Sequence, residues 1–252
     1  MNSKKFDTKN YEFNKGSKIG VYLIHGFSST TYEMKVLANF LKDKNYHVVL
    51  NNLPGHGTTV QDCNKTTYQE WLDYSKIEFA KLASSVDSIF VIGGSLGGVV
   101  ALYLSTVFPV KGIIVGGTVL EFQKSFYTKY INPFMCRLLK SRPKKLIYPK
   151  GIRSSIQFYG YDNYPLIAYN EFKKMNQKIK ARLSKVKAPI LIIHSSSDRM
   201  SIKANVHIIK QGINSKYKEI LNIQRAHHNM FDTNPDTDKI FGTCDKFIKK
   251  YL

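Results

Sequence analysis

The sequence predicts an α/β fold in which a mostly parallel central sheet is flanked by helices, and three observations carry that prediction. Short runs rich in valine and isoleucine recur along the chain, each bounded by glycine or proline. Segments of helical length separate these runs, as parallel strands require. The chain has 252 residues, of which 43% are apolar and 22% charged, so it can bury the core of one such domain. We therefore expect a single domain over residues 1–252.

The expected elements alternate along the chain. Strands are predicted at residues 20–24, 47–50, 88–92, 112–115, 189–193 and 219–223, where the apolar runs are short. Helical patterns are predicted at residues 31–44, 67–84, 97–108, 202–211 and 236–251. Residues 88–110 contain no charged side chain and have the length of a membrane span. Because they include four glycines and Pro109, we interpret them as a buried strand, a tight turn and a buried helix.

The segment from about Val119 to Lys187 is too long for a plain crossover, so we expect an insertion there. Residues 121–187 hold sixteen Lys and Arg against three Asp and Glu, and thus most of the chain's net charge of +20. The segment is also rich in phenylalanine and tyrosine. Such a segment favours ligands with an anionic or amphipathic part, or peripheral contact with an anionic lipid surface.

Cysteine use and the first residues of the chain indicate the compartment. Cys63, Cys136 and Cys244 are far apart and odd in number, and they form no Cys-x-x-Cys pair. This pattern argues against a disulfide framework or a zinc site. No apolar stretch follows the first lysines, so we expect no secretory signal and a cytoplasmic protein.

Ser95 is the candidate nucleophile. It lies in Gly-Gly-Ser-Leu-Gly-Gly, residues 93–98, directly after an apolar strand and directly before a buried helix. A serine raised above a sheet needs a sharp strand-to-helix turn with neighbours that lack side chains. The alternative is a glycine-rich packing turn in which the serine has no role.

Two backbone N–H groups are expected to form an oxyanion hole beside Ser95. A His-Gly-Phe sequence, residues 25–27, ends the first strand. A loop there can bring the N–H of Phe27 close to that of Leu96, and two such donors stabilise a tetrahedral oxyanion. His25 itself is expected to structure the loop.

An acid and a histidine follow in the order that serine hydrolases with this turn use. Asp198 comes after the strand at 189–193, and the pair His227 and His228 comes after the strand at 219–223. A histidine can take the proton of Ser95, and a buried carboxylate orients the imidazole. Spacing favours His228 over His227 as the base. Alternatively, Asp198 caps the helix predicted at 202–211.

Five segments together, residues 22–29, 53–57, 93–98, 189–198 and 226–229, resemble the small bacterial carboxylesterase and monoacylglycerol lipase group of α/β-hydrolases. The resemblance implies an α/β-hydrolase fold in which the insertion forms a cap over the acyl pocket. It also implies a Ser95–His228–Asp198 triad, with Phe27 and Leu96 as oxyanion donors. The Gly-Gly-Ser-Leu-Gly sequence of the predicted turn is closer to that of the carboxylesterase branch. Members often carry Ser-Gly-His or Ala-Tyr-His before the base, whereas this chain has Ala-His-His.

The sequence therefore predicts a serine carboxylic ester hydrolase that acts through an acyl-enzyme on small acyl esters and needs no metal or organic cofactor. An acyltransferase or a thioesterase would use the same triad, so both stay open. A non-catalytic protein that binds a polyanion or a membrane through the basic insertion is a third alternative. Nucleotide binding and metal hydrolysis are disfavoured, because residues 93–98 match no phosphate-binding glycine motif and no His-Glu-x-x-His sequence is present.

Overall fold

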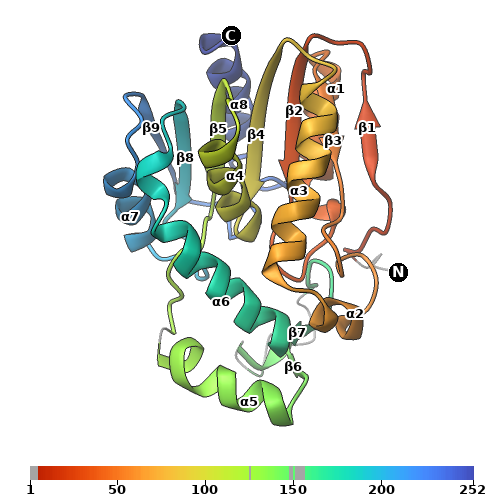
Figure 1. Ribbon diagram of the computed structural model, residues 1–252, viewed down its shortest axis with the longest axis vertical. Coiled ribbons are helices and arrows are strands. Elements are labelled where there is room, and N and C mark those ends of the chain that lie inside the picture. The colour runs from red at the N-terminus through yellow and green to blue at the C-terminus, as the bar shows by residue number, and fades with distance from the viewer. Residues whose placement is uncertain (1–4, 125, 148–149, 151–156) are drawn as a thin grey trace.

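The computed structural model describes residues 5–124, 126–147, 150 and 157–252, and Figure 1 shows their arrangement. A seven-stranded sheet lies at the centre, in the order β1-β3-β2-β4-β5-β8-β9. All neighbouring strands are parallel except β1, which runs antiparallel to β3. The strands are β1 (Tyr11–Phe13), β2 (Ile19–Ile24), β3 (His47–Leu50), β4 (Ser88–Gly94), β5 (Gly112–Gly116), β8 (Ile190–Ser195) and β9 (Lys218–Ile223). The predicted fold class is confirmed.

Helices cover both faces of the sheet (Figure 1). One face packs against α3 (Tyr68–Ala83), α4 (Leu96–Val107) and α7 (Ala204–Gly212). The other packs against α1 (Lys35–Asp43) and α8 (Thr237–Lys250). Side chains of a strand alternate between the two cores: Tyr22 lies in the first and Leu23 in the second. The helices therefore fix both surfaces of the sheet whose strand ends carry the candidate site.

The six predicted strands and five predicted helices are all present, with small differences at their ends. The helix predicted at 31–44 begins as a 3-10 turn, η1 (Thr31–Met34), and the side chain of Thr30 caps it. Outside the insertion, two short elements were not predicted, β1 and α2 (Val60–Lys65). Elements of three and six residues are too short for a hydrophobic period to reveal them.

The uncharged run at 88–110 forms β4 and α4. β4 pairs with β2 on one side and with β5 on the other, and both of its faces are covered. A central strand and a buried helix account for the lack of charge. Among the described residues, no helix is long and apolar enough to cross a membrane.

The chain forms a separate group of elements between β5 and β8, which are neighbours in the sheet. Most of them lie at the lower end of the molecule in Figure 1, and the last of them return to the level of the sheet. They are η2 (Tyr127–Ile131), α5 (Asn132–Leu138), β6 (Ser141–Pro143), η3 (Lys144–Ile147), β7 (Asn163–Pro165), α6 (Leu166–Lys180) and η5 (Leu183–Lys185). Tyr161 joins them to the loops after β2 and β3, because its N–H donates to Ser28 O at 3.0 Å and its hydroxyl donates to Gly55 O at 2.6 Å.

Candidate active site

Ser95 occupies a sharp turn between β4 and α4. Its φ of 53° and ψ of −113° lie where side chains other than glycine are rarely found, at a cost of about 1–3 kcal/mol. The turn is held by a hydrogen bond of 2.9 Å from Ser95 N to Gly116 O. Glycine is required on both sides: a Cβ at Gly93 would lie 2.1 Å from Gly97 O, and one at Gly97 would lie 2.0 Å from Ile24 O. The strained strand-to-helix turn that the sequence predicts is therefore present, and we call it the elbow.

Asp198 and His228 meet although thirty positions separate them. His228 Nδ1 lies 3.0 Å and 2.9 Å from the two carboxylate oxygens of Asp198. The Asp198 side chain has no exposed surface, and His228 keeps 18% of its side chain exposed. The N–H groups of Met200 and Ser201 also donate to Asp198 Oδ1, at 2.8 and 3.0 Å. Asp198 therefore accepts hydrogen bonds from the loop that follows it and binds His228. It does not cap α7, which begins at Ala204.

The two adjacent histidines have different surroundings. His228 faces Asp198, whereas His227 is exposed to solvent. Ala226, just before them, is fully buried, and its carbonyl accepts a hydrogen bond from the buried Ser195 side chain. This anchor fixes the loop so that the structure places His228, of the two, at the acid.

A pair of glycines links the elbow to the Asp198–His228 pair. Gly116 accepts the hydrogen bond from Ser95 N, and the next residue, Gly117, has a φ of +53°. A Cβ at Gly117 would lie 3.1 Å from Asp198 Oδ2 and 3.3 Å from His228 Nδ1. In the described part of the chain, no hydrogen bond joins Ser95 Oγ to His228. In free enzymes this contact is often long and shortens when substrate binds.

Asp198 and His228 each shift the pKa of the other. Burial alone would raise the pKa of Asp198, but His228 and the two N–H donors outweigh burial and lower it. Burial alone would lower the pKa of His228, but the charge and hydrogen bond of Asp198, with a smaller contribution from Glu33, raise it. The carboxylate thus stays ionised while the imidazole exchanges a proton.

The loop that carries Phe27 lies over the elbow. A Cβ at Gly26 would come within 3.2 Å of Ser95 Cβ. The Phe27 ring packs against Trp71 and against Phe172 of α6, at 6.3 and 5.5 Å between centroids. Leu96 is the first residue of α4, so its N–H has no partner within the helix. Phe27 and Leu96 therefore sit on the two segments that flank Ser95.

Two buried histidines hold this loop in place. His25 Nε2 accepts from Leu53 N at 3.1 Å, and its Nδ1 lies 2.8 Å from Gly26 O. His56 Nε2 accepts from Ser28 N at 3.2 Å, and burial lowers the pKa of His56 to about 3. A neutral His56 fits this acceptor role. It supports Ser28, whose φ of 55° is unusual for a serine. The position of His56 in the sequence does not predict this role.

Glu33 is a buried acid near Ser95, and no pattern in the sequence predicts its position there. Only 2% of it is exposed, and its Oε2 accepts from Gly26 N at 3.1 Å. Its Oε1 lies 3.2 Å from where a Cβ at Gly94 would be. Glu33 thus supports the loop before Phe27 and lies beside the turn before Ser95. Its spacing from these residues follows no motif, so only the folded arrangement reveals it.

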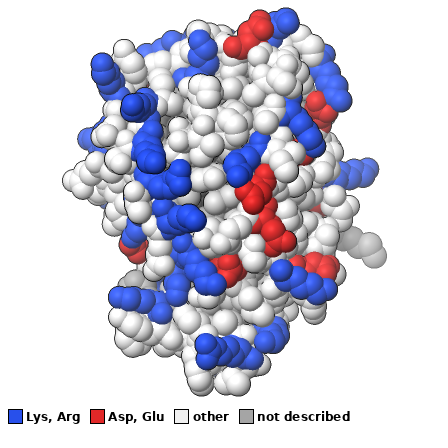
Figure 2. Space-filling model, in the orientation of Figure 1, with Lys and Arg blue, Asp and Glu red and all other residues white. Residues whose placement is uncertain are grey.

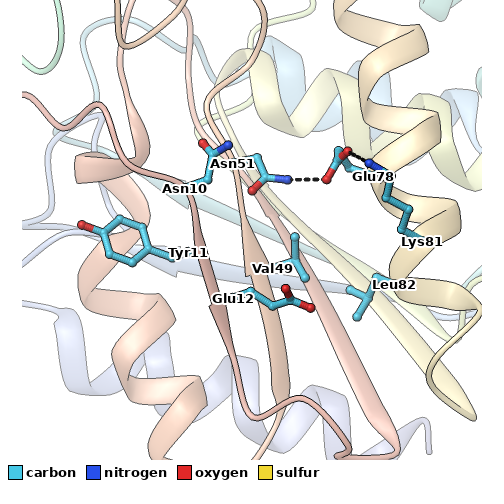
Figure 3. A pocket seen from close by; sticks show the side chains of 8 residues that line it. All are labelled: Asn10, Tyr11, Glu12, Val49, Asn51, Glu78, Lys81 and Leu82. Atoms are coloured by element: carbon cyan, nitrogen blue, oxygen red, sulfur yellow. Dashed lines mark hydrogen bonds and ion pairs between the residues drawn. The ribbon is translucent and has the colours of Figure 1, made fainter.

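A cavity of about 300 Å³ lies elsewhere, at the edge of the sheet beside β1, β3 and α3. Figure 3 shows that three of its polar side chains pair: Glu78 accepts from Asn51 and from Lys81, at 2.8 and 2.6 Å. None of the candidate site residues lines it. Its lining residues are Asn10, Tyr11, Glu12, Val49, Asn51, Glu78, Lys81 and Leu82.

The three cysteines are buried and unpaired. Over the residues that the structure describes, no group of three or more His, Cys, Asp or Glu side chains could hold a metal ion. The polar groups near Ser95 are a hydroxyl, an imidazole with its carboxylate, and the N-terminus of a helix. Groups of these kinds can carry out acyl transfer when they lie together.

Known proteins are similar to this chain over most of its length. A thermostable monoacylglycerol lipase from Bacillus sp. (strain H-257) is 29% identical over 211 residues, covering 83% of this chain and 82% of the relative. A carboxylesterase from Bacillus subtilis (strain 168) is 20% identical, with 94% of each chain covered. A solved structure described as "LipS and LipT, two metagenome-derived lipolytic enzymes" is 25% identical, with a TM-score of 0.85 over 96% of this chain and 98% of that one.

These similarities agree with the resemblance found in the sequence and confirm an enzyme of the α/β-hydrolase superfamily. The family described as "Serine aminopeptidase, S33" matches residues 16–236, and the chain belongs to that family.

Proposed function

We propose that this chain is a serine carboxylic ester hydrolase, similar to carboxylesterases and monoacylglycerol lipases, that acts through Ser95, His228 and Asp198. The observation that carries the proposal is the junction of a strained serine turn with a buried Asp–His pair through Gly116 and Gly117. The names of the relatives support an ester as the substrate.

The mechanism follows from the charge states of these groups. His228 takes the proton of Ser95, and Ser95 Oγ attacks the ester carbonyl. Asp198 orients the imidazole and stabilises the imidazolium that forms. His228 then gives its proton to the departing alcohol, and water activated by the same imidazole releases the acid from the acyl-enzyme. No step needs a cofactor.

The oxyanion of the tetrahedral intermediate would be bound by the N–H groups of Phe27 and Leu96. Leu96 adds the positive end of the α4 dipole. On the Phe27 side, Glu33 accepts a hydrogen bond from Gly26 N, and this contact limits the movement of Phe27. Donors fixed before substrate arrives cost no reorganisation during the reaction.

We also propose that the chain is one domain in which residues 119–187 form a cap over the acyl pocket. Two aromatic rings of α6, Tyr169 and Phe172, contact the ring of Phe27 at 5.9 and 5.5 Å between centroids. Phe122 lies against both of them. An apolar roof of this kind suits an acyl chain. The basic character of the cap favours esters with an anionic part and contact with anionic lipid.

The raised pKa of His228 gives the expected pH dependence. Only the neutral imidazole can accept the Ser95 proton, so kcat/KM should fall as the pH drops through a value above the ordinary histidine pKa of about 6.5. Asp198, whose pKa is lowered, stays ionised throughout that range. Initial rates on a soluble ester across the acid range check this. A profile that stays level well below about pH 6 would contradict the role of His228.

Esters should be preferred over peptides with a free amino terminus. The excess of Lys and Arg in the insertion repels the protonated amine of such a peptide. We expect p-nitrophenyl esters to be hydrolysed at least about 10²-fold faster, in kcat/KM, than the matching aminoacyl p-nitroanilides. A panel that varies acyl length and head-group charge in both series measures this. Equal or faster anilide cleavage would overturn the assignment to esters.

A further inference from the structure

An unusual helix runs through the insertion from residue 126 to residue 138, where the π-helical turn η2 continues into α5. Four large side chains spaced four residues apart project from it into solvent: Phe126, Tyr130, Phe134 and Leu138. Each is more than half exposed. Residues four apart share one face of a helix. We call these four side chains the apolar ridge.

The opposite face of the same helix is buried, although its residues are small or polar. Thr128, Asn132 and Cys136 follow the same spacing and are at most 8% exposed. Thr128 Oγ1 lies 2.9 Å from the hydroxyl of Tyr169, and Asn132 Nδ2 donates to Leu166 O at 3.0 Å. These contacts with α6 fix the rotation of the helix. The fold therefore presents the apolar face outward, against the usual pattern of a surface helix.

Positive charge surrounds the ridge. Residues 122–161 contain nine Lys and Arg and no Asp or Glu. Lys124, Lys129, Arg137 and Lys140 are all exposed on or beside the helix. In Figure 2 the lowest part of the molecule, where the insertion lies, shows blue and white atoms. Large exposed apolar side chains among cations match the acyl and headgroup layers of an anionic bilayer surface.

We propose that the apolar ridge is a membrane-docking element, which inserts into the interface of an anionic lipid bilayer while the surrounding Lys and Arg bind the headgroups. The proposal rests on the proposed ester hydrolase function for its purpose, since docking would bring lipid esters to the site. α6 provides the connection: it holds the ridge helix through Leu166 and Tyr169, and Tyr169 also contacts Phe27. One helix thus joins the bilayer contact to the loop beside Ser95.

The test is co-sedimentation with vesicles of phosphatidylcholine alone and of equal parts phosphatidylcholine and phosphatidylglycerol. Ser95→Ala serves as the parent, so that no hydrolysis occurs. We expect the parent to bind the mixed vesicles and the double variant Phe134→Ser/Leu138→Ser to bind them about 10²-fold more weakly, because two large apolar side chains no longer insert. Arg137→Gln/Lys140→Gln should lose the preference for phosphatidylglycerol.

The control is Ile77→Ser/Tyr217→Ser, which removes two exposed apolar side chains of α3 and of the loop before β9. It should bind as the parent does. With Ser95 restored, all variants should hydrolyse a soluble short-chain ester at the wild-type rate, which shows that they fold. Equal binding by the ridge variant, or no binding by the parent, would overturn docking and leave the ester hydrolase proposal standing. A dimer that the ridge variant dissociates would instead assign the ridge to a second copy of this chain.

Discussion

Replacing Ser95 by alanine should lower kcat/KM for a p-nitrophenyl ester by about 10⁴-fold or more. The hydroxyl is the proposed nucleophile, and no other group at the turn can form the acyl-enzyme. Oxyanion donors and binding would still leave a small residual rate. Steady-state kinetics of the purified variant, with circular dichroism to verify folding, measure the loss.

Ser105→Ala is the matched control, because Ser105 is also buried and lies on α4, the helix that follows Ser95, where it donates to Leu102 O at 2.8 Å. It should retain activity within about twofold, since a hydrogen bond within a helix contributes about 1 kcal/mol to stability and nothing to the reaction. A Ser95→Ala enzyme that keeps a tenth or more of the wild-type rate would exclude Ser95 as the nucleophile.

The neighbouring histidines should differ by a similarly large factor. His228→Ala is expected to reduce kcat by about 10⁴-fold, because the nucleophile and the base act as a unit. His227→Ala should change kcat by less than about twofold, since that side chain points into solvent. The two variants have the same change in composition one residue apart, so each controls for the other. The kinetics of both on one soluble ester provide the measurement.

Asp198→Asn tests the contribution of the acid to the proposed triad. It keeps the size of the side chain but removes the charge that raises the pKa of His228. We expect a loss of about 10³–10⁴-fold in kcat. If His227→Ala were the inactive variant and His228→Ala kept its activity, the contact between His228 and Asp198 would have no catalytic meaning.

The central sheet could be predicted because its pattern has one physical cause. β4 pairs on both sides and packs on both faces, so no charged residue fits there and the run is visible in the sequence. The elbow could be predicted for a related reason, because Gly93 and Gly97 make contacts that leave no space for a Cβ. Local requirements of this kind restrict the residue type directly.

Other features depend on loops that meet only in the folded chain. Glu33 and His56 bind N–H groups of the loop at residues 26–28 from two different segments. No periodicity records such a meeting. The choice between His227 and His228 is similar, because adjacent side chains point in different directions and the anchored Ala226 decides which one faces Asp198.

The insertion was the least predictable part for a different reason. Its helix at residues 126–138 buries Thr128 and Asn132 and exposes Phe134, so the rule that apolar side chains face inward fails there. Only its composition could be used, and composition indicated a basic, aromatic segment without giving its elements.

The most direct test of the account is covalent labelling by a fluorophosphonate, followed by peptide mass spectrometry. We predict one adduct per chain, on the peptide that contains Ser95, and none on the Ser95→Ala variant, because only a serine activated by its base reacts readily at neutral pH. Undiminished labelling of Ser95→Ala, or an adduct on a different residue, would contradict the proposal that Ser95 is the nucleophile of this hydrolase.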